Sequence, residues 1–335
     1  MKAGCLSVLH GRPVWDIGRK LNYYYFGLWC IDYYIALLYN QKEYNIMRLT
    51  ILILFIAVFP AGARDLPAKW EELVASDWDR ALEKSGYTCI LPMGVLEKHG
   101  PHAPLGSDII HAREWAARAA EIEYAVVFPE FIYGQVYEAM HQPGTFTIPS
   151  DLMWSLLQAT VDEIARNGFK KILILNGHGG NNHFIRYFIQ AQLEKKRDFA
   201  VYLHTPPADP EQNRKIMEMR KSDPSYDGHA GERETSTLLY LRPDLVIQDR
   251  ADDESGKNLA RLELTDLYTG IWWYASYPNH YAGEGSAGSR ELGKLITDHY
   301  VESVVRNLRV IKNDIRTIEL QDEFYKRVEK GFRQE

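Results

Sequence analysis

The sequence predicts an α/β fold in which a single domain is built on a mostly parallel sheet with helices on both faces. Residues 87–92, 170–175 and 199–204 are apolar along most of their length, which is typical of strands buried on both faces. Helical patterns separate these strands along the chain, as the crossover connections of a parallel sheet require. The first two strands run into loops rich in Gly and His. We therefore expect ligand-binding groups at the carboxyl edge of the sheet.

The other elements are predicted from periodicity and from helix-stop residues. Residues 65–86 are expected to form a helix, because Trp70, Leu73, Val74 and Leu82 recur at helical spacings and Gly86 can end it. We expect a further strand at 124–129 and helices at 109–123, 150–168, 182–197, 229–241 and 289–311. The polar, Pro-containing residues 205–228 predict a surface excursion, and the charged end after 311 is expected to be solvated.

Composition narrows the class of protein and of partner. The chain has 335 residues, 46% hydrophobic content and a net charge of -6, with no basic stripe, so nucleic acid is not a favoured partner. Cys5, Cys30 and Cys89 form neither a CxxC pair nor a disulfide framework. Cys89 lies in an apolar strand, where an inert buried thiol is the favoured interpretation.

The beginning of the chain differs from the rest. Residues 47–63 have a basic residue after a Met, a short apolar core and a final Ala-x-Ala, which are the three parts of a secretory signal peptide. We expect export to the periplasm or secretion, with the mature domain at 64–335 and no membrane span left after cleavage. Residues 1–46 are interpreted as an upstream extension. A membrane anchor at 47–63 is the alternative.

The loop after the first strand carries Glu97, His99, His102 and Asp108. Glu97 and His99 are two residues apart, so in extended backbone their side chains point the same way. Together with Asp108 they could hold a divalent metal. The alternative for Asp108 is that it caps the following helix.

The loop after the next strand in the pattern, residues 176–181, reads NGHGGN and carries His178. A His between glycines suits a metal ligand, because the missing side chains let an ion approach the backbone. The alternative is a phosphate cradle at the next helix N-terminus. Neither the GxGxxG spacing nor a Lys-Ser/Thr ending is present, which disfavours it.

Taken together, these motifs resemble the creatininase (creatinine amidohydrolase) family. The match runs in order through residues 92–102, 106–108, 141–145, 176–181 and 229–236, and it spans roughly 65–311. The resemblance implies a single α/β domain, a homo-oligomer that is often a hexamer, and two divalent metal ions at the carboxyl ends of parallel strands. Zinc, manganese and iron occur in the family.

The resemblance also implies roles for individual residues. Glu97 would bind one metal ion together with His178, His99 would bind the other, and Asp108 would bridge them. Two cations about 3.5–4 Å apart make a water acidic enough to attack a carbonyl carbon. His229 matches the family's catalytic histidine and would move the proton to the leaving nitrogen.

One metal ligand differs from the family pattern. Creatininase has a Glu where this chain has Gly180, so we expect Glu232 to supply the missing carboxylate. The rival is Glu234, which on a helix would face about 200° away from Glu232. A favourable interaction of Glu232 with the helix dipole is the alternative without a metal. His102 and His141 lie in matched motifs and are expected to touch substrate or to support the ligands.

The expected activity is hydrolysis of a non-peptide C–N bond, in a cyclic amide or a formamide of a small molecule. The difference at Gly180 disfavours creatinine itself as the substrate. The alternatives are a hydrolase for an oxidised sugar or cyclitol, and a secreted binding protein of the same fold that has no catalytic activity.

Overall fold

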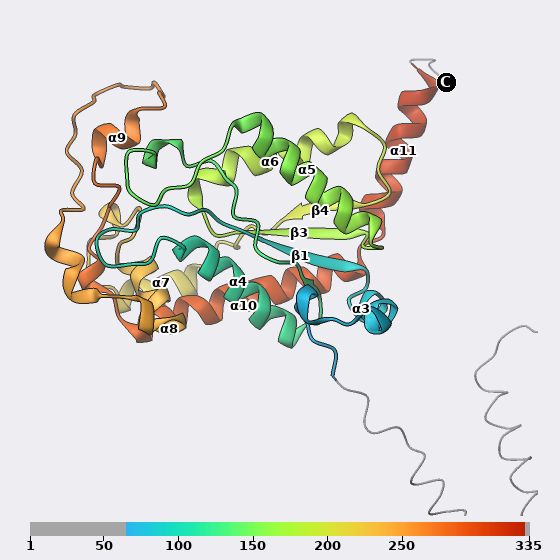
Figure 1. The fold of residues 1–335 in the computed structure, drawn as a ribbon, viewed down its shortest axis with the longest axis horizontal. Helices are drawn as coiled ribbons and strands as arrows, with labels where there is room; N and C mark the ends of the chain where they lie inside the picture. Colours follow the sequence, from blue (N-terminus) through green and yellow to red (C-terminus); the bar gives the residue numbers. More distant parts are fainter. Residues whose placement is uncertain (1–64, 332–335) are drawn as a thin grey trace, which may run out of the picture. The chain divides into compact units, whose positions relative to one another are not determined.

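A parallel four-stranded sheet forms the centre of the protein (Figure 1). The computed structural model describes residues 65–331. The strands are β1 (Thr88–Met93), β2 (Val126–Val127), β3 (Lys171–Asn176) and β4 (Ala200–Leu203), in the order β2-β1-β3-β4. Every neighbouring pair is parallel. The predicted α/β class is therefore confirmed.

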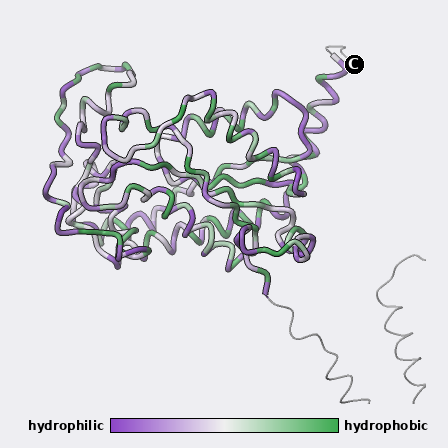
Figure 2. Tube along the Cα trace, in the orientation of Figure 1, coloured by the Kyte–Doolittle hydropathy of each residue, from purple (hydrophilic) through white to green (hydrophobic). Residues whose placement is uncertain are grey.

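Helices cover both faces of the sheet, which explains why the strands are apolar throughout. Figure 1 shows α5 (Ser150–Arg166) and α6 (Asn182–Ala191) on one side, with α4 (Ser107–Ile122) and α10 (Arg290–Asn313) on the other. Alternate strand residues enter the two cores: Leu91 packs in the cluster with Phe188, and Ile90 packs in the cluster with Val304. Figure 2 shows the same concentration of hydrophobic residues along the strands. Burial also raises the pKa of the Cys89 thiol, as expected for an inert cysteine.

The segment before β1 is not the single helix that we predicted. It forms two short 3-10 helices, Trp70–Glu72 and Ala75–Asp77, and then the α-helix α3 (Trp78–Lys84). The backbone just before Trp70 instead pairs with the sheet edge, where Val127 N–H donates to Ala68 O. Because Trp70 also packs against Phe128 and Phe169, tertiary contacts outweigh the helical periodicity of this segment.

Two other segments contain more helix than we predicted. Within the polar excursion lies α7 (Pro210–Met219), which begins with Asp209 as its N-cap. The chain after α10 forms α11 (Arg316–Lys330), where Tyr325 is buried.

The helices near the site are α8 (Glu232–Leu241) and α9 (Trp272–Ser276). The remaining 3-10 helices are Tyr137–Ala139, Gly179–Asn181, Gln192–Glu194, Pro224–Tyr226, Pro243–Leu245, Gln248–Asp253 and Gly285–Ala287.

The predicted signal peptide at 47–63 and the extension at 1–46 lie outside the described residues. Between residues 65 and 331 the structure contains no helix that is long and apolar enough to cross a membrane.

Two glycines let the loops after β1 and β3 converge on the start of α4. A Cβ on Gly177 would lie 2.2 Å from the carbonyl oxygen of Asp108, and one on Gly94 would lie 2.8 Å from the Asp108 carbonyl carbon. Met93 and Asn176 are register partners at the ends of the two strands. This close approach brings the polar residues of both loops to one edge of the sheet.

We predict that acid destabilises the fold through His204, which follows β4 and packs against α10. Asn307 Nδ2 donates to its Nδ1 at 2.9 Å, and Ser303 Oγ lies 3.1 Å from its Nε2. Burial lowers the pKa of His204 from 6.5 to about 4. The unfolded chain therefore binds this proton first, and stability is lost as the pH falls from 6.5 toward 4, by at most about 1.4 kcal/mol per pH unit.

Urea unfolding at several pH values tests this. His204→Gln should flatten the decline in the free energy of unfolding below pH 6.5, relative to the wild type. His299→Gln, a change on α10 itself, is the control. An unchanged slope in His204→Gln would contradict the prediction.

Candidate metal centre

Residues from two loops and from the first turn of α4 bring carboxylates and imidazoles together at the carboxyl edge of the sheet. Glu97 and His99 come from the β1–α4 loop, Asp108 from the first turn of α4, and His178 from the loop after β3. Nδ1 of His178 lies 2.8 Å from Glu97 Oε1 and 3.1 Å from Asp108 Oδ2, while Nε2 of His99 lies 3.1 Å from Asp108 Oδ1. The two oxygens of Asp108 therefore face different histidines.

Backbone carbonyls orient three histidines toward this cluster. Nε2 of His178 lies 2.8 Å from Gln135 O, Nδ1 of His99 lies 3.1 Å from Glu97 O, and Nε2 of His229 lies 2.7 Å from Lys98 O. Because a carbonyl oxygen can only accept, the nitrogen that faces it carries the proton. In the neutral ring the other nitrogen has a free lone pair, and in all three residues that nitrogen faces the carboxylates.

The cluster also contains buried oxygens without donors. Within residues 65–331, neither Glu97 Oε1 nor Asp108 Oδ2 receives a well-directed hydrogen bond, although both are fully buried. A buried carboxylate oxygen without a donor is costly unless a cation compensates it. The residues that could hold a metal ion form three groups, in each of which the ligand atoms lie within 4.8 Å of one another: Glu97, Asp108 and His178; His99, Asp108 and Glu234; and Glu97, His99 and His229.

Electrostatics at the centre favours positive charge between the carboxylates. Burial raises the pKa of Glu97, but the charges of His178 and His229 outweigh it and hold the pKa well below its ordinary value. Burial lowers the pKa of His178, yet Glu97 and Asp108 raise it well above the ordinary value. The same competition raises the pKa of His99 to about 9. In His229, by contrast, burial prevails and lowers the pKa.

The structure corrects our prediction for Glu232. Its carboxylate is buried and accepts hydrogen bonds from Lys221 N at 2.7 Å and from Ser222 N at 2.9 Å, with Ser222 Oγ at 2.7 Å and Arg220 Nε at 3.4 Å. These donors satisfy both oxygens and hold them against the turn before α8. Glu232 therefore fixes the start of the helix and does not face the candidate ligands.

Glu234 takes the position that we predicted for Glu232. Its Oε2 lies 3.9 Å from His99 Nε2 and 3.9 Å from His229 Nδ1, and it accepts a hydrogen bond from Ala230 N at 2.6 Å. The two glutamates are two residues apart on α8 and point in different directions, as helical geometry requires. The sequence argument found the pair and selected the wrong member.

The other predicted residues divide between the centre and its surroundings. His229 lies at the centre, with Nδ1 3.9 Å from Glu97 Oε1. His141 lines the pocket above it, where its Nε2 lies 2.7 Å from Pro278 O. His102 is buried behind the centre, and its Nε2 lies 2.8 Å from Thr235 Oγ1. His102 supports α8 and does not line the pocket.

The NGHGGN loop shapes the centre through its side-chain amides. Asn176 Nδ2 donates to His178 O at 2.6 Å, and Asn181 Oδ1 accepts from Gln135 N at 2.8 Å. The asparagines thus hold both His178 and the residue whose carbonyl orients it. A Cβ on Gly180 would lie 2.4 Å from His178 Nε2, so this position has no room for a side chain.

Two functional residues were missed in the sequence. The Nε2 of His280 lies 2.5 Å from Glu97 Oε2, and His280 follows α9, outside the motifs on which the sequence analysis depends. Gln135 acts through its backbone carbonyl, which no side-chain pattern reports. Asp108 was given a capping alternative, but the N-cap of α4 is Gly106 and makes no side-chain capping bond.

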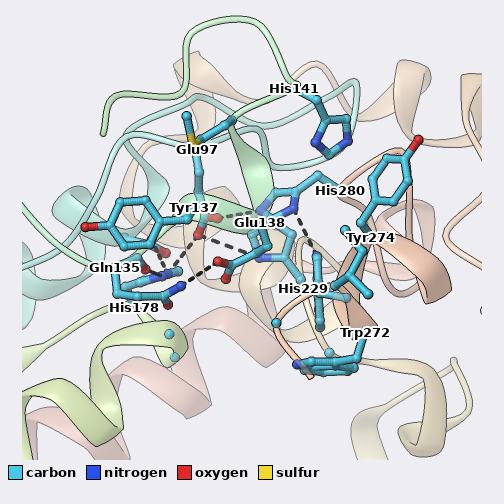
Figure 3. Close-up of a pocket in the computed structure, with 18 of the residues that line it drawn as sticks. Glu97, Gln135, Tyr137, Glu138, His141, His178, His229, Trp272, Tyr274 and His280 are labelled. Carbon is cyan, nitrogen blue, oxygen red and sulfur yellow. Dashed lines mark hydrogen bonds and ion pairs between the residues drawn. The ribbon is translucent and has the colours of Figure 1, made fainter. Parts of the chain in front are cut away.

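The centre lies at the base of a cavity of about 800 Å³ (Figure 3). Glu97, His178, His229 and His280 gather on one side, and Trp272, Tyr274 and His141 project toward the cavity from another. Gln135, Tyr137 and Glu138 complete the labelled lining. A cavity of this size that combines aromatic walls with a cluster of carboxylates and imidazoles suits a small molecule.

Comparison with known proteins identifies relatives of this chain. The family model Creatininase (creatinine amidohydrolase) matches residues 71–308. Creatinine amidohydrolase of Pseudomonas putida is 27% identical over 252 residues, covering 71% of this chain and 95% of that protein. A 3-dehydro-scyllo-inosose hydrolase of Thermotoga maritima is 26% identical, covering 65% and 76%. A mycofactocin precursor peptide peptidase of Mycolicibacterium smegmatis is 31% identical, covering 48% and 60%.

Solved structures show the same fold. A crystal structure of creatininase superposes with a TM-score of 0.63 at 23% identity, covering 74% of this chain and 99% of the other. Similar structures include creatininase with manganese and a Zn–Zn form of a creatininase mutant. With the family model matched over most of the described chain and a site rich in candidate metal ligands, the chain belongs to the creatininase family of amidohydrolases.

Proposed function

We propose that the protein is a dinuclear metal hydrolase that cleaves a C–N bond other than a peptide bond in a small molecule. One ion would be held by Glu97, Asp108 and His178, and the other by His99, Asp108 and Glu234. The observation that carries the proposal is the pair of Asp108 oxygens, each 3.1 Å from a different histidine nitrogen. A carboxylate placed in this way suits a bridge between two cations.

The donor set narrows the choice of metal. It contains imidazole nitrogens and carboxylate oxygens without a thiolate, which suits zinc, manganese or iron. Two such ions would supply an acidified water and polarise the substrate carbonyl. The protein's own contribution is to bury the carboxylates and to fix the histidine orientations through Gln135, Glu97 and Lys98 carbonyls.

His229 is proposed as the group that moves the proton. Its Nδ1 faces the cluster and its Nε2 is held by Lys98 O at 2.7 Å, so the ring presents a fixed lone pair to the space above the carboxylates. A histidine in this place can take a proton from the attacking water and give it to the leaving nitrogen. The aromatic wall, with Trp272 and Tyr274, would hold the substrate over it.

Creatinine remains disfavoured as the substrate because Gly180 leaves no room for the Glu of creatininase. A hydrolase for an oxidised cyclitol is the second candidate, and it is favoured by the match over 246 residues to the inosose hydrolase. Purified protein should be assayed, with its metal content, against lactams, formamides, an oxidised cyclitol and a peptide. Turnover of only the peptide would overturn the proposed specificity, and inactivity with fewer than two ions per chain would overturn the dinuclear proposal.

We also propose a homo-oligomer, with a hexamer as the family's usual state. Beside the cavity, Leu267 and Tyr268 are 70% and 84% exposed, and Ile271 is 56% exposed. Exposed apolar residues grouped in one segment favour a protein contact. Analytical ultracentrifugation should give more than one copy per particle, and a monomer at micromolar concentration would contradict this proposal.

Replacing His229 by Asn should lower the turnover rate about 10²–10⁴-fold while both ions stay bound, because a proton carrier is lost and no ligand is. Inductively coupled plasma mass spectrometry of the variant gives the metal stoichiometry. Loss of one ion per chain would show that His229 is a ligand.

Replacing Glu234 by Gln should remove about one ion per chain, because the His99 site loses a charged ligand. Glu232→Gln is the matched control on the same helix. It should keep both ions and lower the free energy of unfolding by roughly 1–3 kcal/mol, since a buried charged acceptor of backbone N–H groups is lost. The opposite pattern of metal loss would contradict the assignment.

A further inference from the structure

His280 is buried beside the metal centre but differs from the other histidines there. It is 2% exposed and has a φ of 52°, which is uncommon for a residue other than glycine. It lies 183 residues from Glu97 in the chain and follows α9. A side chain held in a left-handed backbone conformation requires support from its surroundings, and the ring contacts provide it.

Both ring nitrogens of His280 have defined partners. The indole Nε1–H of Trp273 donates to His280 Nδ1 at 3.0 Å. An indole nitrogen can only donate, so Nδ1 accepts and in the neutral ring the proton lies on Nε2. That Nε2–H donates to Glu97 Oε2 at 2.5 Å. The three groups therefore form a directed chain from Trp273 through His280 to Glu97.

This direction is opposite to that of His99, His178 and His229. Each of those rings donates to a backbone carbonyl and presents a lone pair to the carboxylates. His280 accepts from Trp273 and presents a proton. Among the described residues, none of the groups that could hold a metal ion includes His280. Its chemistry at this place is that of a donor to a carboxylate, and not that of a ligand.

We propose that Trp273 and His280 are positioning residues for Glu97, which hold Oε2 so that Oε1 alone is presented to a metal ion. The proposal deepens the proposed dinuclear site and rests on it. The geometry supports it, because Oε1 lies 2.8 Å from His178 Nδ1 and has no well-directed donor in the described chain, whereas Oε2 is taken by His280. Donors of this kind fix the orientation of a ligating carboxylate.

The pair also joins the metal centre to the wall of the cavity. Trp273 belongs to α9 together with Trp272 and Tyr274, which line the same cavity as Glu97. Trp273 lies in contact with Trp272 at 5.3 Å between ring centroids and with His229 at 6.0 Å. One hydrogen-bonded pair therefore connects the aromatic wall to Glu97.

Metal titration of the chelator-stripped protein tests the proposal without an activity assay. Zn²⁺ and Co²⁺ would be added to the wild type and to His280→Gln, His280→Leu and Trp273→Phe. Leu and Gln at position 280 must both adopt the same left-handed backbone conformation, but only Gln keeps an N–H donor. His280→Leu should weaken the binding of one ion about 10–100-fold, with His280→Gln closer to the wild type. Trp273→Phe should also weaken metal binding, but by less, because the imidazole of His280 remains while the indole N–H no longer fixes its tautomer.

The outcomes separate this inference from the proposed function. A wild type that binds fewer than two ions would overturn the dinuclear site. A wild type with two ions, and a Leu variant with the same two affinities, would overturn the positioning role alone. Complete loss of one ion in His280→Gln would overturn it as well, since His280 would then be a ligand. If His280→Leu does not fold, an unchanged metal affinity in both His280→Gln and Trp273→Phe would overturn the positioning role of Trp273 and His280.

Discussion

The burial of two carboxylates is the constraint on which the rest of the site depends. Glu97 and Asp108 are 1% and 2% exposed, and both remain ionised because their pKa values are held below the ordinary range. Taking such charges out of water is costly unless opposite charge compensates them. The surrounding histidines and the proposed cations would supply that opposite charge. The same arrangement would therefore stabilise the buried carboxylates and provide the proposed hydrolytic chemistry.

Backbone carbonyls give the centre its rigidity. The carbonyls of Glu97 and Lys98 belong to the loop that also carries His99, so one short segment orients its own ligand and His229. Gln135 O reaches His178 from a loop 43 residues away, and Asn181 holds Gln135 in place. Because each histidine is fixed at its far nitrogen, its near nitrogen has little freedom. Such preorganisation is what a metal site with catalytic function needs.

The two sides of the cavity serve different purposes. The sheet edge supplies charged groups on rigid loops, and Gly94 and Gly177 allow those loops to meet at Asp108. The segment around α9 supplies aromatic surface and has exposed apolar residues beside it. The family includes a creatinine amidohydrolase and an inosose hydrolase. The charged side of the cavity suits the hydrolytic chemistry that these enzymes share, and the aromatic side suits the selection of a substrate, in which they differ.

The sequence by itself determined the fold class, the family and the ligand-bearing loops. Apolar strands and motifs such as NGHGGN are local patterns, and the residues that follow parallel strands must meet at one edge of the sheet. It did not determine which of Glu232 and Glu234 faces the centre, because that depends on the rotation of α8 against the turn at Lys221 and Ser222. It also assigned no role to His280, Trp273 or Gln135. His280 meets Glu97 across 183 residues of chain, Gln135 acts on His178 through a backbone carbonyl 43 residues away, and Trp273 acts through His280. The helix predicted at 65–86 was wrong for the same reason, since contacts with the sheet edge outweighed local periodicity. Tertiary structure decided whatever depended on contacts between distant segments, because local propensity is weaker than the packing and hydrogen bonds that those segments form.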